Sequence, residues 1–257
     1  MGGFYDGKIR IKLLGMENII NEKSNLEIIP FNDDSVILSI AVDQTEEYLF
    51  LGNSKGNVAL YKMNLEQKKF YELLTLSDHM APITHIHCSS ELNLWISSSI
   101  DGYINLYTLP LSKLVRTIKL EEKKCSYSFL ISSPIPCIVV ICDECGNSEI
   151  YVYSINGKII SKKQEYFKIH KPIIFRDANF NEYMAYLGKH CIYVVKLPNL
   201  ELIVSKDGIK NSHFICCNED MTMLYVLNKN GSEVNLVRDE DKKLRASTFV
   251  IKNLNKI

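Results

Sequence analysis

The chain has 257 residues, of which 46% are apolar, and 30 basic residues balance 30 acidic residues to a formal net charge of zero. A chain of this length and composition buries a substantial core, and zero net charge removes the simplest argument for nucleic-acid binding. The longest apolar run, Ile135 to Cys142, is eight residues long, whereas a membrane-spanning helix needs about 20. No succession typical of a secretory signal opens the sequence, so we expect a cytoplasmic protein with no integral membrane segment.

The eight cysteines stand mostly inside apolar, strand-like segments, at positions 88, 125, 137, 142, 145, 191, 216 and 217. Their spacing lacks the even framework of a small secreted domain. We therefore expect reduced, buried thiols rather than disulfides.

A unit recurs along the chain, and it is clearest when residues 37–63 are laid over residues 83–109 without a gap. Both windows show a strand, a polar turn, a second strand, a tight glycine turn and a third strand. The matched pairs are Ile37 with Ile83, Ile40 with Ile86, Gly56 with Gly102, Leu60 with Leu106 and Tyr61 with Tyr107. Repetition of this kind indicates a repeat architecture.

The period of the repeat identifies the architecture. Equivalent positions in the expected third strands are Lys12, Tyr61, Tyr107, Tyr153, Val195 and Val237, with successive separations of 49, 46, 46, 42 and 42 residues. About 40–45 residues with four short strands per unit is typical of a β-propeller blade. No ten-residue stretch shows convincing helical periodicity, so we expect almost no helix.

The sequence thus predicts an all-β, WD-repeat-like β-propeller with about five complete four-stranded blades and one partial amino-terminal blade. We expect a single domain over residues 1–257, with the partial blade at 1–34, blades at 35–80, 81–122, 123–168, 169–206 and 207–251, and a tail at 252–257. The predicted blade turns contain Gly7, Gly56, Gly102, Gly146 and Gly231. Asn230-Gly231-Ser232 also matches a glycosylation acceptor, but Asn-Gly is a favoured hairpin dipeptide.

The first unit lacks a first strand in this reading. Residues 1–5 align with a second strand, residues 8–14 with a third and residues 26–31 with a fourth. Propellers protect their sheet edges by sharing a blade between the two termini. We therefore expect the missing strand, and a further blade, to come from preceding sequence of a larger protein, and we expect the chain alone to be marginal or aggregation-prone.

The best-formed unit runs from Leu76 to Leu120 and resembles the WD-repeat family. That family places a His before the first strand, a Ser or Thr in the second, an Asp in the hairpin turn and a Trp in the third. The matching residues are His79, Ser99 (or Ser97 on the same face), Asp101 and Tyr107. The resemblance implies a structural tetrad that satisfies buried polar groups and fixes strand register.

Two features qualify this resemblance. His79, Ser99 and Asp101 are also the residue types of a hydrolase triad, although Ser99 lies in an expected strand rather than a nucleophile elbow. Other units depart from the consensus: Lys55 replaces the Asp before Gly56, two extra residues follow Cys145-Gly146, and Val195 and Val237 replace the aromatic ring. Those blades are expected to depend on apolar packing.

Two groups of residues contain side chains that can bind a metal ion. Cys142 and Cys145 have the spacing of half a zinc site, but no second ligand pair stands nearby at telling spacing. His85 and His87 share a strand face, with His79 upstream, yet no carboxylate or cysteine accompanies them at a matching spacing. We expect no metal, cofactor or catalytic site.

A second resemblance concerns the segment SPIPCIVVICDECGNSEIYVYSINGK, from Ser133 to Lys158, and the opening GGFYDGKI. Both are similar to the carboxy-terminal propellers of BEACH-domain proteins, the neurobeachin and beige group, which carry a "SINGK"-type hairpin and a GGFWDGR-type blade. The resemblance implies a large cytosolic scaffold in vesicle and membrane traffic.

On this basis we expect a non-catalytic scaffold that binds protein partners through its rim and loops. It would be cytoplasmic and peripheral to intracellular membranes, with membrane association only through other domains or partners. The alternatives are a WD-repeat adaptor of a coat, nuclear-pore or ubiquitin-ligase complex, and a propeller enzyme with ionisable residues converging at the central channel.

Overall fold

The computed structural model describes residues 31, 35–64, 66–67, 69–121, 123–177, 179–205 and 215 in full, together with the backbone of short strands towards both ends. The chain divides into two compact units, Met1–Leu130 and Ile131–Ile257. The described residues contain β-strands and no helix, and accordingly none of them belongs to a helix that could cross a membrane.

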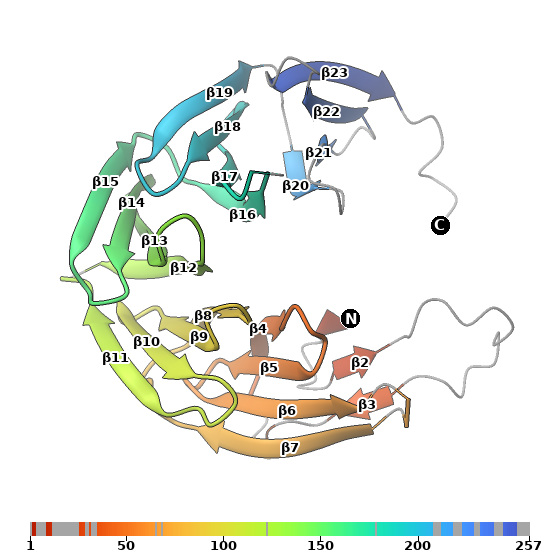
Figure 1. The fold of residues 1–257 in the computed structure, drawn as a ribbon, viewed down its shortest axis with the longest axis vertical. Helices are drawn as coiled ribbons and strands as arrows, with labels where there is room; N and C mark the ends of the chain where they lie inside the picture. Colours follow the sequence, from red (N-terminus) through yellow and green to blue (C-terminus); the bar gives the residue numbers. More distant parts are fainter. Residues whose placement is uncertain are drawn as a thin grey trace, which may run out of the picture. The chain divides into compact units, whose positions relative to one another are not determined.

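The first unit contains one three-stranded and two four-stranded antiparallel sheets, each built from consecutive strands (Figure 1). The first sheet comprises β1 (Gly2–Gly3), β2 (Ile9–Ile11) and β3 (Leu26–Ile28). The second comprises β4 (Ile37–Val42), β5 (Tyr48–Asn53), β6 (Val58–Asn64) and β7 (Lys69–Leu76). The third comprises β8 (Ile83–Ser89), β9 (Leu94–Ser99), β10 (Tyr103–Thr108) and β11 (Leu114–Lys119).

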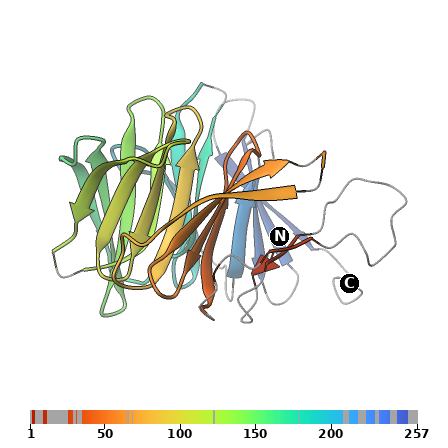
Figure 2. The ribbon, with the colours of Figure 1, turned by 90° about the horizontal axis from the view of Figure 1, so that it is seen from below.

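The next sheet begins with β12 (Lys124–Ile131), within which the boundary between the two units falls. It continues with β13 (Cys137–Glu144), β14 (Asn147–Ser154) and β15 (Ile159–Glu165). The following sheet comprises β16 (His170–Arg176), β17 (Glu182–Leu187), β18 (Cys191–Lys196) and β19 (Glu201–Asp207). The last comprises β20 (Ser212–Cys217), β21 (Met223–Asn228), β22 (Ser232–Arg238) and β23 (Leu244–Val250). Strands of one sheet run side by side in both ribbon views (Figure 2).

The all-β prediction and the four-stranded antiparallel unit are confirmed. The three-stranded sheet lies where the partial blade was expected, while the blade limits and the single domain over residues 1–257 stay predictions. The two extra residues after Cys145-Gly146 belong to β14, which pairs with β13 from Asn147 onward and is longer than the third strands of the preceding sheets. Gly7, Lys12 and Gly231 lie outside the described residues.

The strand pairings repeat with the sequence period. In four sheets the register between the third and fourth strands shifts at the same repeat position, at Leu60/Tyr61, Leu106/Tyr107, Val152/Tyr153 and Val194/Val195. Such a shift marks a β-bulge, in which one strand contributes an extra residue. The repeat frame inferred from sequence is therefore also the structural frame.

The core of the first unit lies between its two four-stranded sheets. Phe50 of β5 packs against Trp95 of β9, with ring centroids 5.0 Å apart, and Trp95 stacks on Tyr107 of β10 at 4.2 Å. Val58 and Leu60 complete the same buried cluster from β6. These alternating strand residues bury one face of each sheet against the other.

The tight turns test this packing. Gly56 and Gly102 have φ angles of +89° and +82°, and a Cβ at either would run into a backbone carbonyl, of His79 and Lys123 respectively. Gly146 has φ +86°, with nothing within 4 Å of its added Cβ. We expect Gly146→Ala to lower the free energy of unfolding by only about 1–2 kcal/mol, the cost of the left-handed conformation for a residue with a Cβ. Gly56→Ala and Gly102→Ala should lower it clearly more, because their Cβ atoms also meet backbone. Chemical denaturation of the three variants checks the order; equal losses would contradict the close approach.

Candidate functional site

A buried polar network in the sheet β8–β11 centres on His79, which lies in the connection from β7 to β8. Its Nε2 lies 2.7 Å from the Ser97 hydroxyl and 3.4 Å from the Asn105 side-chain amide, which both donate to it. Thr117 of β11 in turn donates to Asn105 Oδ1 at 2.7 Å. Burial lowers the pKa of His79, although the charges of Asp101 and Asp78 act in the opposite direction. The neutral ring therefore ties the connecting loop directly to β9 and β10, and through Asn105 to β11.

Tyr107 occupies the position where the WD-repeat pattern has Trp. It stacks on Trp95 and its hydroxyl donates to Asp78 Oδ2 at 3.0 Å. Burial, reinforced by the Asp78 carboxylate, raises the pKa of Tyr107. The aromatic ring thus keeps the packing role, and its hydroxyl adds a second bond to the loop before β8.

The predicted tetrad is assembled differently in two places. Ser97 rather than Ser99 meets His79, while Ser99 donates to the carbonyl of Ala81 at 3.0 Å. Asp101 accepts a hydrogen bond from the backbone N–H of Tyr103 at 3.0 Å and influences His79 through its charge. Ser97 and Ser99 are both fully buried, so a substrate cannot reach either hydroxyl and the hydrolase interpretation gains no support.

The neighbouring sheet contains a counterpart of the Ser99 contact. Asn53 of β5 donates to Ser35 at 2.8 Å, and these residues lie 46 positions before Ser99 and Ala81. Asn53 also accepts from the backbone N–H groups of Lys55 and Asn57 in the turn. Asn53 was not singled out from sequence, although the repeat offset alone could have identified it.

His85 and His87 on β8 bind the backbone of β12 rather than a metal. Nδ1–H of His85 donates to the carbonyl of Ser128 at 2.8 Å, and the N–H of Leu130 donates to Nδ1 of His87 at 3.1 Å. Phe129 packs against both rings, at 4.8 and 5.5 Å between centroids. The two rings therefore satisfy one donor and one acceptor on the edge of β12.

Both imidazoles are held neutral by this environment. Each residue as a whole is partly exposed to solvent, but its imidazole ring is packed among protein atoms. Burial lowers the pKa of His85 from 6.5 to about 4, against the opposing effect of the bond to Ser128. Burial and the adjacent His85 lower the pKa of His87 to about 3. A proton on Nδ1 of His87 would remove the acceptor that Leu130 needs.

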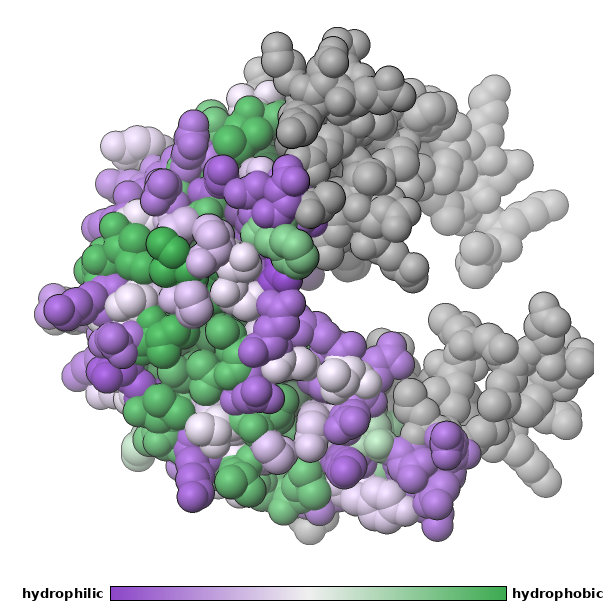
Figure 3. Space-filling model, in the orientation of Figure 1, coloured by the Kyte–Doolittle hydropathy of each residue, from purple (hydrophilic) through white to green (hydrophobic). Residues whose placement is uncertain are grey.

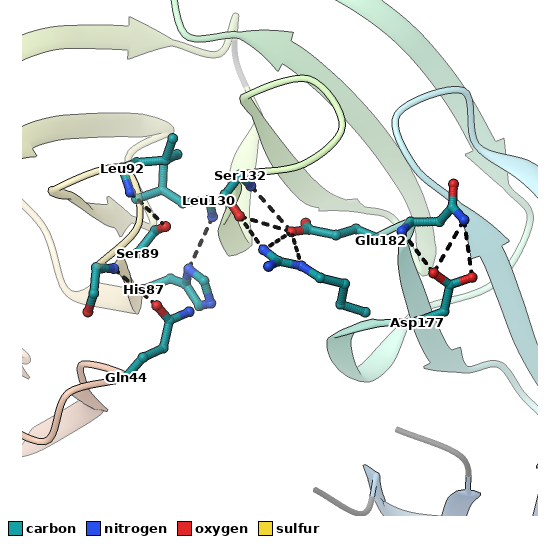
Figure 4. A network of polar contacts seen from close by, with 11 residues as sticks. Gln44, His87, Ser89, Leu92, Leu130, Ser132, Asp177 and Glu182 are labelled. Atoms are coloured by element: carbon teal, nitrogen blue, oxygen red, sulfur yellow. Dashed lines mark hydrogen bonds and ion pairs between the residues drawn. The ribbon is translucent and has the colours of Figure 1, made fainter. Parts of the chain in front are cut away.

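A second polar network lies where first strands end, at a position that recurs as Asp43, Ser89, Ser132 and Asp177. In the first unit, Asp43 accepts from the N–H of Tyr48 at 2.7 Å and from the Ser90 hydroxyl at 3.2 Å. Gln44 accepts from the N–H of Ser90 at 3.1 Å (Figure 4). These bonds join the β4–β5 turn to the β8–β9 turn of the next sheet.

In the second unit the equivalent link is an ion pair. Glu182 at the start of β17 accepts from Arg176 Nη2 at 2.7 Å and Nε at 3.2 Å, and from the Ser132 hydroxyl at 3.1 Å (Figure 4). Glu182 is buried, and burial of the Cys137 thiol, reinforced by the charge of Glu182, raises the pKa of Cys137 to about 12. A buried pair that lost one partner would leave a costly uncompensated charge. The network therefore fixes the β12–β13 loop against the β16–β17 loop.

The cysteine pair weighed as a zinc half-site lies in the β13–β14 hairpin. Cys142 is buried in β13, and Cys145 is exposed in the turn with φ +48°. Among the described residues, no three histidine, cysteine or acidic side chains gather as metal ligands. The absence of a structural zinc stays a prediction.

No family model and no curated protein matches the sequence. Among solved structures, the chain is similar to the Cps50 (Swd1) beta-propeller domain of Myceliophteria thermophila, with a TM-score of 0.61 and 14% identity over 84% of this chain and 71% of that one. It is also similar to a chain of the mitotic checkpoint complex, with a TM-score of 0.70 and 10% identity over 90% of this chain and 69% of that one.

The fold is that of a WD-repeat β-propeller. Both relatives share it, and at 10% and 14% identity the likeness concerns the fold alone. It says nothing of a BEACH-domain origin. Within this fold, the networks around His79 and at the first-strand ends hold loops on neighbouring blades in place.

The His79 network makes a stability prediction. Ser97→Ala removes the hydroxyl bonded to His79 inside the core and should lower the free energy of unfolding by roughly 1–3 kcal/mol. Thr75→Ala is the control, because its hydroxyl bonds Glu72 at an exposed position and should have little effect. Equal urea midpoints for the two variants would show that the bond to His79 is not important for folding.

The histidines of β8 predict a pH dependence. In the unfolded chain the histidine pKa is 6.5, whereas in the folded chain the pKa of His85 is about 4 and that of His87 about 3. The unfolded state therefore binds more protons in this window, and the free energy of unfolding should fall as pH falls from 6.5.

The measurement is urea unfolding from pH 7 down to about pH 5. Below that limit protonation of carboxylates also changes the free energy of unfolding. The double variant His85→Asn, His87→Asn retains a donor and an acceptor without the titration, so its stability should change less with pH. His190→Asn, on an exposed residue, is the control. An unchanged slope in the double variant would overturn the assignment.

Proposed function

We propose that the chain is a non-catalytic protein-interaction module whose contact surface includes the β12–β13 and β16–β17 loops. Each loop presents one apolar side chain to solvent, Ile135 at 53% exposure and Phe180 at 62%. The buried Ser132–Arg176–Glu182 network joins the two loops. Exposed apolar side chains on rigid loops are typical of binding hot spots.

Phe180 carries the argument because a bulky aromatic residue stands at a left-handed turn position and exposes most of its ring. Three equivalent turns close in the same way: Glu46, Asn93 and Phe180 have φ angles of +57°, +51° and +61°, and the N–H of each donates to the carbonyl three residues earlier. Asn tolerates this left-handed conformation, whereas a bulky residue is an outlier. Phe180 thus pairs backbone strain with an exposed aromatic ring, which a site of interaction explains.

The loop beneath Phe180 is well supported. Asp177 accepts from the backbone N–H groups of Asn179 at 2.8 Å and Asn181 at 2.9 Å, and from the Tyr183 hydroxyl at 3.2 Å. Burial opposes these bonds, but together they lower the pKa of Asp177. The Arg176 guanidinium lies 5.8 Å from the Phe180 ring centroid. An anchor that is already ordered loses little entropy on binding.

We extend the proposal to the setting that the sequence suggests. The "SINGK" hairpin, Ser154–Lys158, and the opening GGFYDGKI support a scaffold of the BEACH type acting in vesicle traffic, in the cytoplasm and peripheral to membranes. The alternative is an adaptor of a coat, nuclear-pore or ubiquitin-ligase complex. It has support in the similarity to a chain of the mitotic checkpoint complex, a multiprotein assembly by its name.

Comparative affinity purification tests both the proposed contact surface and the proposed cellular setting. Phe180→Asn should lose a defined set of partners while melting at the same or a higher temperature, because Asn suits the turn. Tyr166→Ser, which removes an exposed ring from another loop, should retain them. The identity of the lost proteins separates trafficking factors from adaptor subunits. Retention of every partner by Phe180→Asn would reject this surface.

A further inference from the structure

The segment from β10 to β11 carries positive charge without any carboxylate. Between Gly102 and Leu120 the sequence contains Lys113, Arg116 and Lys119 and no Asp or Glu. All three side chains are exposed. Asp101 and Glu121 flank the segment, so its positive charge is confined to the residues between them.

No described carboxylate lies within ion-pair distance of these cations. Lys113 and Arg116 form no ion pair with any described side chain, and Lys119 Nζ lies 5.4 Å from the ring centroid of Tyr103. An aromatic face attracts a cation but leaves its charge in place. The positive potential of the segment therefore reaches solvent.

Apolar side chains alternate with the cations. Leu111 is 68% exposed, Leu114 54% and Val115 47%. We call residues 111–119 the basic-apolar strip. In the space-filling view, hydrophilic and hydrophobic patches lie side by side over β11 (Figure 3). A segment that offers cations and aliphatic groups together suits an anionic surface with an apolar layer just beneath it.

The backbone of the strip argues against a peptide strand as its occupant. β11 is the fourth strand and forms an edge, but its register with β10 shifts between Leu106 and Tyr107, so that Val115 is the extra residue of a bulge. Bulges interrupt the ladder that an added strand would have to extend. An acidic peptide adding to this edge is therefore disfavoured.

β15 does not share the unneutralised charge of the strip. It also exposes two aliphatic residues, Ile159 and Ile160. Its lysines, however, are paired: Lys162 lies 3.0 Å from Glu149 and Lys163 lies 2.8 Å from Glu165. Both outer strands expose aliphatic residues, and of the two only β11 carries cations that form no ion pair with a described side chain.

We propose that the basic-apolar strip binds directly to anionic lipid membranes. Lys113 and Arg116 meet lipid phosphate and carboxylate groups, while Leu111, Leu114 and Val115 enter the headgroup boundary. This adds a direct contact to a chain for which the sequence suggested membrane association only through other domains or partners. It is independent of the loop surface around Phe180.

Vesicle co-sedimentation of the full chain tests the proposal. The vesicles are phosphatidylcholine alone and phosphatidylcholine with about one third phosphatidylserine, the source of surface charge. We expect binding to the anionic vesicles only, weakened by added salt. Removal of two juxtamembrane cations in Lys113→Gln, Arg116→Gln should lower the partition coefficient about 30-fold. Leu114→Ser should lower it several-fold.

The matched control is Lys158→Gln, Lys162→Gln, which removes the same charge from exposed positions on and beside β15 and should bind as the unchanged chain does. Equal loss in both double variants would overturn the proposal, because net charge would then explain binding. Tighter binding to a poly-glutamate peptide than to vesicles would assign the strip to an acidic protein. If Lys113→Gln, Arg116→Gln aggregates and the unchanged chain never binds vesicles, the cations only protect the edge.

Discussion

The stack of Phe50, Trp95 and Tyr107 shows the constraint on which the rest of the structure depends. A four-stranded sheet whose strands alternate side chains has two apolar faces and cannot bury both by itself. Each sheet must therefore pack against others, as β5 and β6 pack against β9 and β10. Trp95 fills the space between two sheets and belongs to neither core alone. Stability is thus distributed between neighbouring sheets, as in other repeat proteins.

Apolar packing alone leaves the register of the sheets undetermined, since many slightly shifted arrangements bury similar areas. Polar bonds between sheets remove this freedom because a misplaced donor or acceptor would be buried without a partner. His79 fixes the loop after β7 against β9, and His85 and His87 fix β8 against β12. At the first-strand ends, Asp43 and Glu182 do the same with different chemistry. The position recurs, while the residue that fills it varies.

The sequence predicted the repeat frame, the tight turns at Gly56 and Gly102 and the place of His79, because each depends on local spacing. It did not distinguish Ser97 from Ser99, since a period of two places both hydroxyls on one strand face. The role of His85 and His87 was missed for another reason. Their partners lie 43 residues away on β12, and a backbone carbonyl or N–H leaves no trace in sequence. The ion pair of Arg176 with Glu182 was missed because it depends on the register of the β16–β17 hairpin, which pairs these two residues across the turn.

The outer strands show how a regular fold acquires individual functions. In four sheets the extra residue of the fourth-strand bulge is aliphatic and about half-exposed: Leu73, Val115, Ile160 and Ile203. A bulge residue is not paired across the ladder, so pairing does not require an aliphatic side chain there. The bulge protects each edge from further strand pairing, which frees the adjacent positions to vary in charge. Around Val115 the cations form no ion pair with a described side chain, and around Ile160 they are paired with Glu149 and Glu165. Specificity in this chain therefore lies in the charges beside a repeated apolar position.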